Sequence, residues 1–223
     1  MQRDLNNTLR ISEIFYSIQG ESTTVGWPTV FIRLTGCPLR CQYCDTSYAF
    51  TGGSIQTLDQ IIEKTQLLHA NSLMKPRITI TGGEPLAQIG CKNLISQLCD
   101  LGYKVSIETS GAFDISNLDP RLMVVMDLKT PDSKESDKNM WQNIDHLKSV
   151  DQIKFVICTP EDYQWAKNNV LERKLYERCD VLFSPSYGQM GLRELAEGVL
   201  QDNLPVRLQT QLHKHIWGEE QGR

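Results

Sequence analysis

TVFIRLTGCPLRCQYC, residues 29–44, is the stretch that decides the fold of this chain. Its first part, Thr29–Leu34, is a run of β-branched and apolar residues that predicts a buried strand. Its second part places Cys37, Cys41 and Cys44 at the spacing C-x3-C-x2-C, with no fourth cysteine or histidine close in sequence. A structural zinc site takes four protein ligands, and a [4Fe–4S] cluster has four irons to be liganded. Three local thiolates leave one position open, which favours a reactive cluster over a structural metal site.

The composition is that of one ordinary globular domain. Of the 223 residues, 40% are apolar and 22% charged. We therefore expect a single domain over residues 1–223, with residues 1–10 as a flexible tail. The net charge of −4 argues against a protein-wide grip on nucleic acid. No apolar run approaches the ~20 residues of a membrane helix, and the polar start shows no signal peptide. The sequence predicts a cytoplasmic protein with reduced cysteines that binds neither nucleic acid nor membrane.

Strand patterns alternate with helical patterns along the chain. The helical patterns begin at Thr57, which forms a capping box with Gln60, and recur around Leu94–Leu101, after Pro160 and around Leu192–Leu200. The expected strands are Thr29–Leu34, Arg77–Thr81, Lys104–Glu108, Leu122–Asp127, Gln152–Ile157, Asp180–Ser184 and Val206–Gln209. This alternation predicts a parallel sheet. The strands are too few for a closed eight-stranded barrel, and Ser110–Arg121 is too short and polar for a crossover helix. We expect an α/β fold, an incomplete (β/α)6-type barrel trimmed of some helices; the alternative is a doubly wound open sheet.

Glycine and polar residues follow the predicted strands one after another. In parallel α/β folds the ligands bind at the carboxyl ends of the strands. The segments that follow the strands are the cysteine loop, Gly82-Gly83-Glu84-Pro85, Thr109-Ser110-Gly111, Lys129-Thr130-Pro131 and Pro185-Ser186-Tyr187. One such turn is unremarkable, but five at the same edge of a sheet predict a site there.

The cysteine loop together with Gly82-Gly83-Glu84-Pro85 resembles the radical S-adenosylmethionine superfamily. The resemblance implies a [4Fe–4S] cluster whose fourth iron is chelated by the amino and carboxylate groups of S-adenosylmethionine. Gly82 and Gly83 would let the backbone approach the methionine moiety, and Glu84 would accept from its ammonium group. For Glu84 the alternative is a loop carboxylate or strand-end cap.

The flanking motifs resemble one family within that superfamily, the 7-carboxy-7-deazaguanine synthases (QueE) of queuosine and 7-deazapurine biosynthesis. The motifs that carry the resemblance are Phe15–Glu21, Phe31–Cys37, Cys44-Asp45-Thr46, Glu108–Gly111, Asp127–Pro131 and Gln209–Lys214. The resemblance implies conversion of 6-carboxy-5,6,7,8-tetrahydropterin into 7-carboxy-7-deazaguanine with loss of ammonia by a radical lyase. It also implies Mg2+, a homodimer and an electron donor such as flavodoxin. Ser22 departs from the pattern, because many relatives have glycine there.

The resemblance also implies site residues. The substrate would be bound by Ile18, Gln19, Gly20, Arg33 and Thr109, with Arg33 as the clamp on the substrate carboxylate. The metal ligands would be Cys37, Cys41 and Cys44 for the cluster and Thr46 for Mg2+. S-adenosylmethionine would be bound by Tyr43, Cys44, Asp45, Gly82, Gly83, Glu84, Gly111, Lys129, Thr130, Pro131, Ser184, Pro185, Ser186 and Tyr187. The chemistry would be supplied by the cofactor, so no catalytic side chain is expected.

Three alternatives stay open at this point. Arg33 can instead belong to a structural ion pair. The chain can be a glycyl-radical-enzyme activase, which shares the cysteine spacing and would tolerate loss of Arg33. A zinc- or cluster-stabilised interaction module would show zinc and no cleavage of S-adenosylmethionine. His213 and His215 are expected to cap or pack a helix and not to bind metal.

Overall fold

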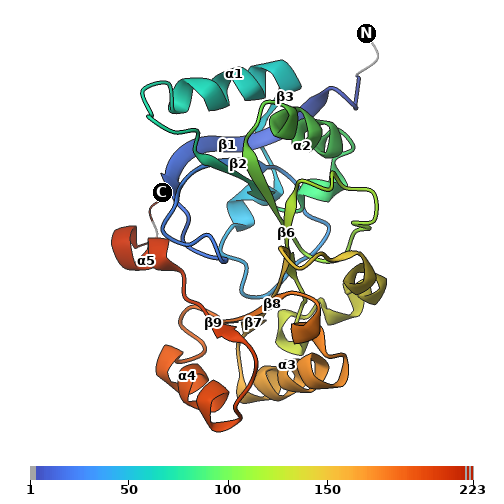
Figure 1. Cartoon of the computed structure of the whole chain (residues 1–223), viewed down its shortest axis with the longest axis vertical. Helices are drawn as coiled ribbons and strands as arrows, with labels where there is room; N and C mark the ends of the chain where they lie inside the picture. The colour runs from blue at the N-terminus through green and yellow to red at the C-terminus, as the bar shows by residue number, and fades with distance from the viewer. Residues whose placement is uncertain (1–3, 219, 221, 223) are drawn as a thin grey trace.

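A nine-stranded sheet runs through the computed structural model in the order β3-β1-β2-β4-β5-β6-β7-β8-β9; the structure describes residues 4–218, 220 and 222 (Figure 1). The strands are β1 (Thr8–Ile18), β2 (Pro28–Leu34), β3 (Ser54–Thr57), β4 (Arg77–Gly82), β5 (Lys104–Thr109), β6 (Met123–Asp127), β7 (Gln152–Ile157), β8 (Asp180–Pro185) and β9 (Arg207–Leu208). The α-helices are α1 (Leu58–Leu68), α2 (Cys91–Asp100), α3 (Pro160–Glu172), α4 (Leu192–Gln201) and α5 (Leu212–Trp217). Short 3-10 helices lie at Ser47–Phe50, Pro85–Ala87, Pro131–Ser133, Ser136–Lys138, Trp141–His146 and Leu175–Glu177.

The strand order confirms the trimmed barrel and not the doubly wound sheet. From β2 to β9 each strand pairs in parallel with the next parallel strand along the chain. A doubly wound sheet would reverse its strand order at a switch point. Residues 110–122, all within the described part of the chain, form no helix, so β5 passes to β6 without a helical crossover. The expected capping box is also present, because Thr57 and Gln60 exchange side-chain to backbone hydrogen bonds at the start of α1.

The amino-terminal part of the chain differs from the expected tail. Residues 8–10 belong to β1, which pairs antiparallel with both β2 and β3. Leu9 is only 1% exposed and joins the core. The polar residues around it hid this strand, since only one face of β1 is buried at that end. Residues 1–3 lie outside the described residues.

Alternation along each strand separates the core from the interior of the barrel. Ile78 and Ile80 of β4 pack into the apolar cluster beneath α2, whereas Thr81 lines the interior. In β7, Ile153 and Phe155 face that cluster, and Lys154 between them faces inward. Successive strand residues point to opposite faces, so this division follows from the sheet itself. Each fully buried aliphatic side chain contributes about 1.5–3 kcal/mol, which holds the strand ends in place around the interior.

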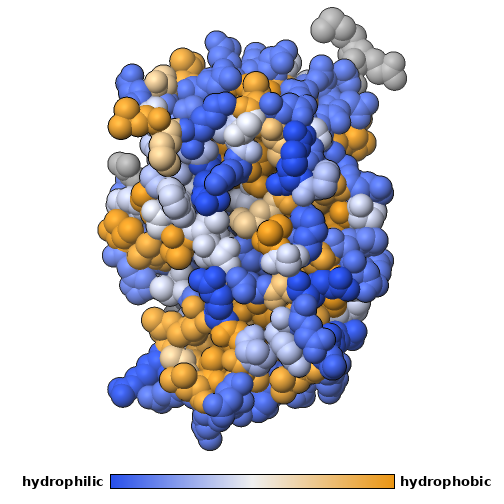
Figure 2. All heavy atoms as spheres, viewed as in Figure 1, coloured by the Kyte–Doolittle hydropathy of each residue, from blue (hydrophilic) through white to orange (hydrophobic). Residues whose placement is uncertain are grey.

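Apolar side chains are exposed on the outer surface near the carboxyl-terminal end of the chain. Figure 2 shows apolar side chains on the surface over α4 and β9, where Leu192, Leu200 and Leu208 are exposed. None of the helices that the structure describes has the length and apolar character needed to traverse a bilayer.

Candidate active site

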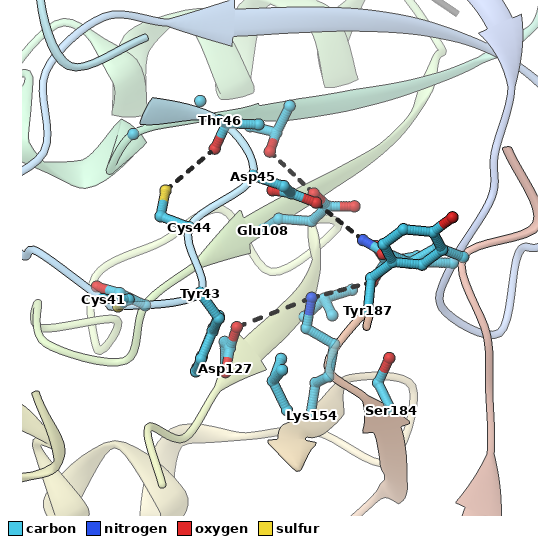
Figure 3. A pocket seen from close by; sticks show the side chains of 18 of the residues that line it. Cys41, Tyr43, Cys44, Asp45, Thr46, Glu108, Asp127, Lys154, Ser184 and Tyr187 are labelled. Carbon is cyan, nitrogen blue, oxygen red and sulfur yellow. Dashed lines mark hydrogen bonds and ion pairs between the residues drawn. The ribbon is translucent and has the colours of Figure 1, made fainter. Parts of the chain in front are cut away.

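A pocket of about 400 Å³ opens at the carboxyl ends of the parallel strands. Its walls come from β2 and the cysteine loop, from the ends of β4 to β8, and from the segment that precedes and begins α5. Figure 3 shows side chains from the cysteine loop, β5, β6, β7 and β8 converging on this space. The size suits a small molecule. The predicted site edge and the observed pocket therefore coincide.

Cys37, Cys41 and Cys44 all line this pocket, and all three are free and half-buried. Burial raises the pKa of the Cys41 thiol to about 11 and also raises the pKa of Cys37. These two groups favour the thiol form in the bare pocket, and a metal centre would draw them into the thiolate form. Within residues 4–218, 220 and 222, no three His, Cys, Asp or Glu side chains gather around one point as ligands of a single ion. The thiolates of a four-iron cluster bind separate irons, so a spread along one pocket wall fits such a cluster.

Gly82 and Gly83 bring the backbone of β4 against the cysteine loop. An ideal Cβ on Gly83 would lie 2.2 Å from the carbonyl oxygen of Gly36 and 2.8 Å from Cβ of Cys37. A Cβ on Gly82, where φ is +142°, would lie 2.2 Å from the carbonyl oxygen of Leu34. Both glycines line the pocket, and their bare backbone is what allows the loop to sit beside it.

Glu84 lies beneath the pocket and not in its lining. Its carboxylate accepts hydrogen bonds from the backbone N–H of Leu86 at 2.9 Å and of Ser110 at 2.7 Å. The hydroxyl groups of Thr109 and Ser110 also donate to it. The side chain is fully buried. The structure therefore places Glu84 in the alternative arrangement, a cap that ties β4 to β5; the role toward an ammonium group stays a prediction.

Tyr43 in the pocket wall has charged neighbours. Tyr43 lines the pocket, and its buried hydroxyl has no hydrogen-bond partner among the described residues. Nζ of Lys129 lies 5.8 Å from the centre of the Tyr43 ring and 3.0 Å from Oδ2 of Asp127. Asp127 Oδ1 likewise is buried and unpartnered among these residues. Unsatisfied polar atoms beside the cysteines are the kind of feature that a bound polar cofactor would satisfy.

Arg33 reaches the pocket from β2 but already has an acidic partner. Its Nε donates to Oε1 of Glu13 at 2.6 Å, and the hydroxyl of Tyr48 donates to the same oxygen at 2.8 Å. The Arg33 side chain is 15% exposed and lines the pocket. The structural ion pair considered in the sequence is thus present. The guanidinium group has four further N–H bonds for a ligand.

The predicted substrate segment is split by the structure. Ile18 and Gln19 line the pocket, and Nε2 of Gln19 donates to Oγ1 of Thr79 at 3.1 Å. Gly20 lies outside the lining and packs against α5, where an ideal Cβ would lie 2.1 Å from Nδ1 of His213. Ser22, which replaces the glycine of many relatives, adopts a left-handed φ of +65°.

Most other predicted residues meet at the pocket. The residues that line it are Cys44, Asp45, Thr46, Thr109, Lys129, Ser184, Pro185, Ser186 and Tyr187. Gly111, Thr130 and Pro131 do not. Gly111 makes a turn with φ +72°, and the Thr130 hydroxyl is buried against the carbonyl oxygen of Val156 and Oδ2 of Asp162. Their predicted contact with S-adenosylmethionine has no support from this geometry.

A charged group in the pocket was missed by sequence reasoning. Glu21, Glu108, Asp127 and Lys154 line the pocket together, and Glu108 accepts from Oγ1 of Thr81 at 2.8 Å. Glu21, Glu108 and Asp127 stood in the quoted motifs without a role. The signal for Lys154 is a lone charge inside a strand of apolar residues.

The carboxyl-terminal segment completes the pocket wall. Nε2 of Gln211 donates to Oε1 of Glu21 and to Oδ2 of Asp45, each at 3.0 Å. Nζ of Lys214 lies 3.3 Å from the same Asp45 oxygen. His213 lines the pocket and packs on Gly20, consistent with the packing role expected for it. The motif Gln209–Lys214 therefore joins the cysteine loop to the rest of the site.

Residues 31–160, more than half of the chain, match the family model of the Radical SAM superfamily. The fold and the cysteine pocket are thus those of a radical S-adenosylmethionine enzyme, and this superfamily implies a [4Fe–4S] cluster and S-adenosylmethionine as cofactors.

Similar proteins narrow the class. The chain is 42% identical to a 7-carboxy-7-deazaguanine synthase of Chlorobaculum tepidum, over 95% of this chain and 96% of that protein. It is 39% identical to a 7-carboxy-7-deazaguanine synthase of Koribacter versatilis, over 95% and 98% of the two chains. The chain belongs to the 7-carboxy-7-deazaguanine synthase family. The crystal structure of QueE from Escherichia coli has the same fold, with a TM-score of 0.72 at 22% identity over 92% of this chain and 95% of that one.

Proposed function

We propose that this chain converts 6-carboxy-5,6,7,8-tetrahydropterin into 7-carboxy-7-deazaguanine with loss of ammonia, in queuosine or other 7-deazapurine biosynthesis. The observation that carries the proposal is one pocket, lined by the three cysteines of the loop and by Gln19 and Arg33, in a chain that belongs to this family. A glycyl-radical-enzyme activase would also hold S-adenosylmethionine in a pocket, but it would tolerate loss of Arg33.

The cluster and S-adenosylmethionine, when bound, would supply the radical chemistry that removes a hydrogen atom from the substrate. In the proposed arrangement Cys37, Cys41 and Cys44 hold the cluster. The backbone at Gly82 and Gly83 and the loop Ser184–Tyr187 line the space beside it. Tyr43 also lines this space.

The substrate would be fixed by groups of matching polarity. Arg33 offers its remaining N–H bonds to the carboxylate, and charge-assisted hydrogen bonds of this kind are the strong ones. Gln19 stands on the neighbouring wall with its amide held by Thr79 at 3.1 Å. Such fixation matters because a misplacement of about 1 Å can cost ~100-fold in rate.

Mg2+ would bind at Thr46, beside the cluster loop. Oγ1 of Thr46 lies 3.7 Å from Sγ of Cys44. A neutral hydroxyl is a weak ligand for Mg2+ alone, so the substrate carboxylate would complete the site. Thr46→Ala should lose the dependence of the rate on Mg2+, and Thr46→Ser should keep it. An unchanged response to Mg2+ in Thr46→Ala would remove Thr46 from this role.

The remaining partners are part of the same proposal. The resemblance supports a homodimer and an electron donor such as flavodoxin. We place the activity in the cytoplasm, since cluster thiolates need a reducing compartment.

The test is anaerobic reconstitution of the full chain with iron and sulfide, followed by S-adenosylmethionine, Mg2+ and 6-carboxytetrahydropterin. We expect 7-carboxy-7-deazaguanine and ammonia. Cys41→Ala should lose both the iron–sulfur absorbance and the product, whereas Cys99→Ala, on the outer helix α2, should keep both. Cleavage of S-adenosylmethionine without conversion of the pterin would overturn the assignment of the substrate.

A further inference from the structure

Lys154 is a lysine enclosed in the barrel. It has no part in holding the iron–sulfur cluster and is not among the predicted substrate ligands. It lies within β7, paired with Asp127 of β6 and Leu182 of β8. Its strand neighbours Ile153 and Phe155 are fully buried in the core. Strand alternation turns the Lys154 side chain inward, where Figure 3 shows it beside Asp127.

The ammonium group of Lys154 is placed between carboxylates. Nζ lies 3.0 Å from Oε2 of Glu21 and 3.8 Å from Oδ2 of Asp127. The side chain is 14% exposed. Burying an ammonium group is costly unless it is paired, so this position has to be balanced by the carboxylates around it.

The carboxylates around Lys154 outnumber the ammonium groups. Glu21, Glu108 and Asp127 face Lys154 and Lys129 inside one pocket. Asp127 is held at 3.0 Å by Lys129, and Glu21 at 3.0 Å by Lys154. Glu108 has only the hydroxyl of Thr81 as a hydrogen-bond partner among the described residues. These three carboxyl groups and two ammonium groups carry no net charge together when Glu108 has a proton and the other two carboxyl groups do not.

The acidities of the two glutamates follow this geometry. Burial alone would raise the pKa of Glu21, but Lys154 and the hydrogen bond from Gln211 outweigh it and lower that pKa. Burial raises the pKa of Glu108, and the more distant Lys154 does not compensate. Two carboxyl groups whose pKa values are pushed apart in one site can serve opposite roles.

We propose that Lys154 is a positioning residue for the reaction: its ammonium group, 3.0 Å from Oε2 of Glu21, holds the Glu21 carboxylate as a hydrogen-bond acceptor on one wall of the pocket. This inference rests on the proposed function. The amino group and ring N–H of the pterin's pyrimidine ring are neighbouring donors, and an ionised carboxylate can accept from both at once.

Other charged groups face Glu21 and enter the test. They are Asp127 from β6, Lys129 from the segment after it, Glu108 from β5, Arg33 from β2, Asp45 from the cysteine loop, and His213 and Lys214 from the carboxyl-terminal segment. Among the described residues, none of these groups makes an ion pair with Glu21; its ion-pair partner is Lys154.

The experiment uses the full chain and the product 7-carboxy-7-deazaguanine as a binding probe, together with the steady-state kinetics of the reconstituted enzyme. The variants are Lys154→Met, Lys154→Arg, Glu21→Gln and the double variant Glu21→Gln/Lys154→Met. Lys167→Met on α3, which removes a 2.7 Å ion pair with Asp202 at the end of α4, is the matched control for losing a paired lysine. Urea unfolding establishes that each variant is folded, and the double variant restores the charge balance if the single one is unstable.

Lys154→Met should weaken product binding and raise KM about 10- to 100-fold, with a smaller change in kcat. Lys154→Arg should recover most of the loss. In wild type, binding should fail only at acid pH, as Glu21 protonates below its ordinary range. In Lys154→Met the ammonium group no longer opposes the effect of burial on the pKa of Glu21, so the pH at which binding fails should move upward. The double variant should bind no worse than Glu21→Gln, because Lys154 acts through Glu21.

Two results would overturn the proposal. In the first, product binding to Lys154→Met fails at the same acid pH as in wild type. In the second, the losses of binding free energy from Lys154→Met and Glu21→Gln add up in the double variant. Both measurements presuppose that the wild-type chain binds the product. If wild type makes no deazaguanine and does not bind it, the proposed function itself has failed. If wild type is active and the Lys154 variants keep its KM and acid limit, only this inference fails.

Discussion

The hydroxyl of Thr109 donates hydrogen bonds to both carboxylate oxygens of Glu84, at 2.9 and 3.0 Å. The two residues stand at the ends of neighbouring strands, and the sequence assigned one to the substrate and the other to the cofactor. Their contact makes them one unit: Glu84 fixes the rotamer of Thr109, and Thr109 presents its other side to the pocket. The floor of the site is therefore held together by contacts within the chain.

Glu84→Ala should destabilise the chain strongly. It leaves the backbone N–H of Leu86 and Ser110 and the Thr109 hydroxyl without an acceptor in a buried place. We expect a loss of about 3 kcal/mol in the free energy of unfolding, measured by urea denaturation. Glu84→Gln keeps the shape but turns one acceptor into a donor, and should lose about 1–2 kcal/mol.

The matched control for Glu84 is Glu63→Ala on the exposed face of α1, which should stay within about 0.5 kcal/mol of wild type. A stable Glu84→Ala variant that nonetheless fails to bind S-adenosylmethionine would contradict the capping role and favour the predicted contact with the ammonium group.

Arg33 should act on the substrate and not only on Glu13. Arg33→Met is expected to raise KM for the pterin about 10- to 100-fold, since it removes a charged donor to the carboxylate. Arg33→Lys should recover little, because a single ammonium cannot reproduce the planar fork. Steady-state kinetics of the reconstituted enzyme give both values.

Glu13→Gln separates the two roles of Arg33. It removes the acidic partner at 2.6 Å while leaving the guanidinium group in the pocket wall. We expect KM to change much less than in Arg33→Met. Equal loss of stability in the two variants with KM unchanged in both would mean that Arg33 serves only the ion pair.

The strand ends were predictable because their chemistry is local in sequence. Cys37 follows Thr29–Leu34 directly, and Gly82-Gly83 follows Arg77–Thr81; parallel strands then bring such segments to one edge without further information. The apolar runs were long enough to mark β7 and β8 almost to the residue.

What could not be predicted depends on partners distant in sequence. β1 was missed because its stability comes from pairing with β2 and β3 and not from its own pattern. The ion pair between Lys154 and Glu21 joins residues 133 positions apart, and the tertiary fold brings them to 3.0 Å. Thr130 was assigned to a ligand because of its motif, yet its hydroxyl is used by Asp162 of α3.

Gly83→Ala should disturb the cysteine loop. The new Cβ would meet the carbonyl oxygen of Gly36 at 2.2 Å and Cβ of Cys37 at 2.8 Å, and neither is the end of a flexible side chain. We expect a loss of about 1–3 kcal/mol in stability and fewer irons bound per chain after reconstitution. Urea denaturation and iron analysis measure the two effects.

Gly191→Ala provides the comparison for Gly83. Its φ is −69°, and an ideal Cβ would have no neighbour closer than 3.5 Å, so the change should stay within about 1 kcal/mol and leave iron loading intact. Normal iron loading in Gly83→Ala would show that the loop can move aside without cost to the cluster.

His213 should make the stability of the chain depend on pH. Burial lowers the pKa of this imidazole in the folded chain, and the nearby Glu21 and Asp45 oppose that effect without cancelling it. Because the lowered pKa belongs to the folded state, the unfolded chain takes up a proton near pH 6.5 while the folded chain stays neutral. Stability is therefore complete above pH 6.5 and is lost as the pH falls from there toward the lowered pKa.

His213→Gln removes this titration while keeping a polar side chain against Gly20. At pH 8 the difference in unfolding free energy between wild type and variant measures the lost packing alone, since imidazole is neutral in both states there. Below pH 6.5 wild type loses stability from His213 and the variant does not, so the difference should narrow, and urea denaturation from pH 8 to pH 5 follows it. A difference that stays constant over this range would mean that His213 ionises equally in the folded and unfolded chains, and that the packing of α5 on the turn at Gly20 does not shield it from water.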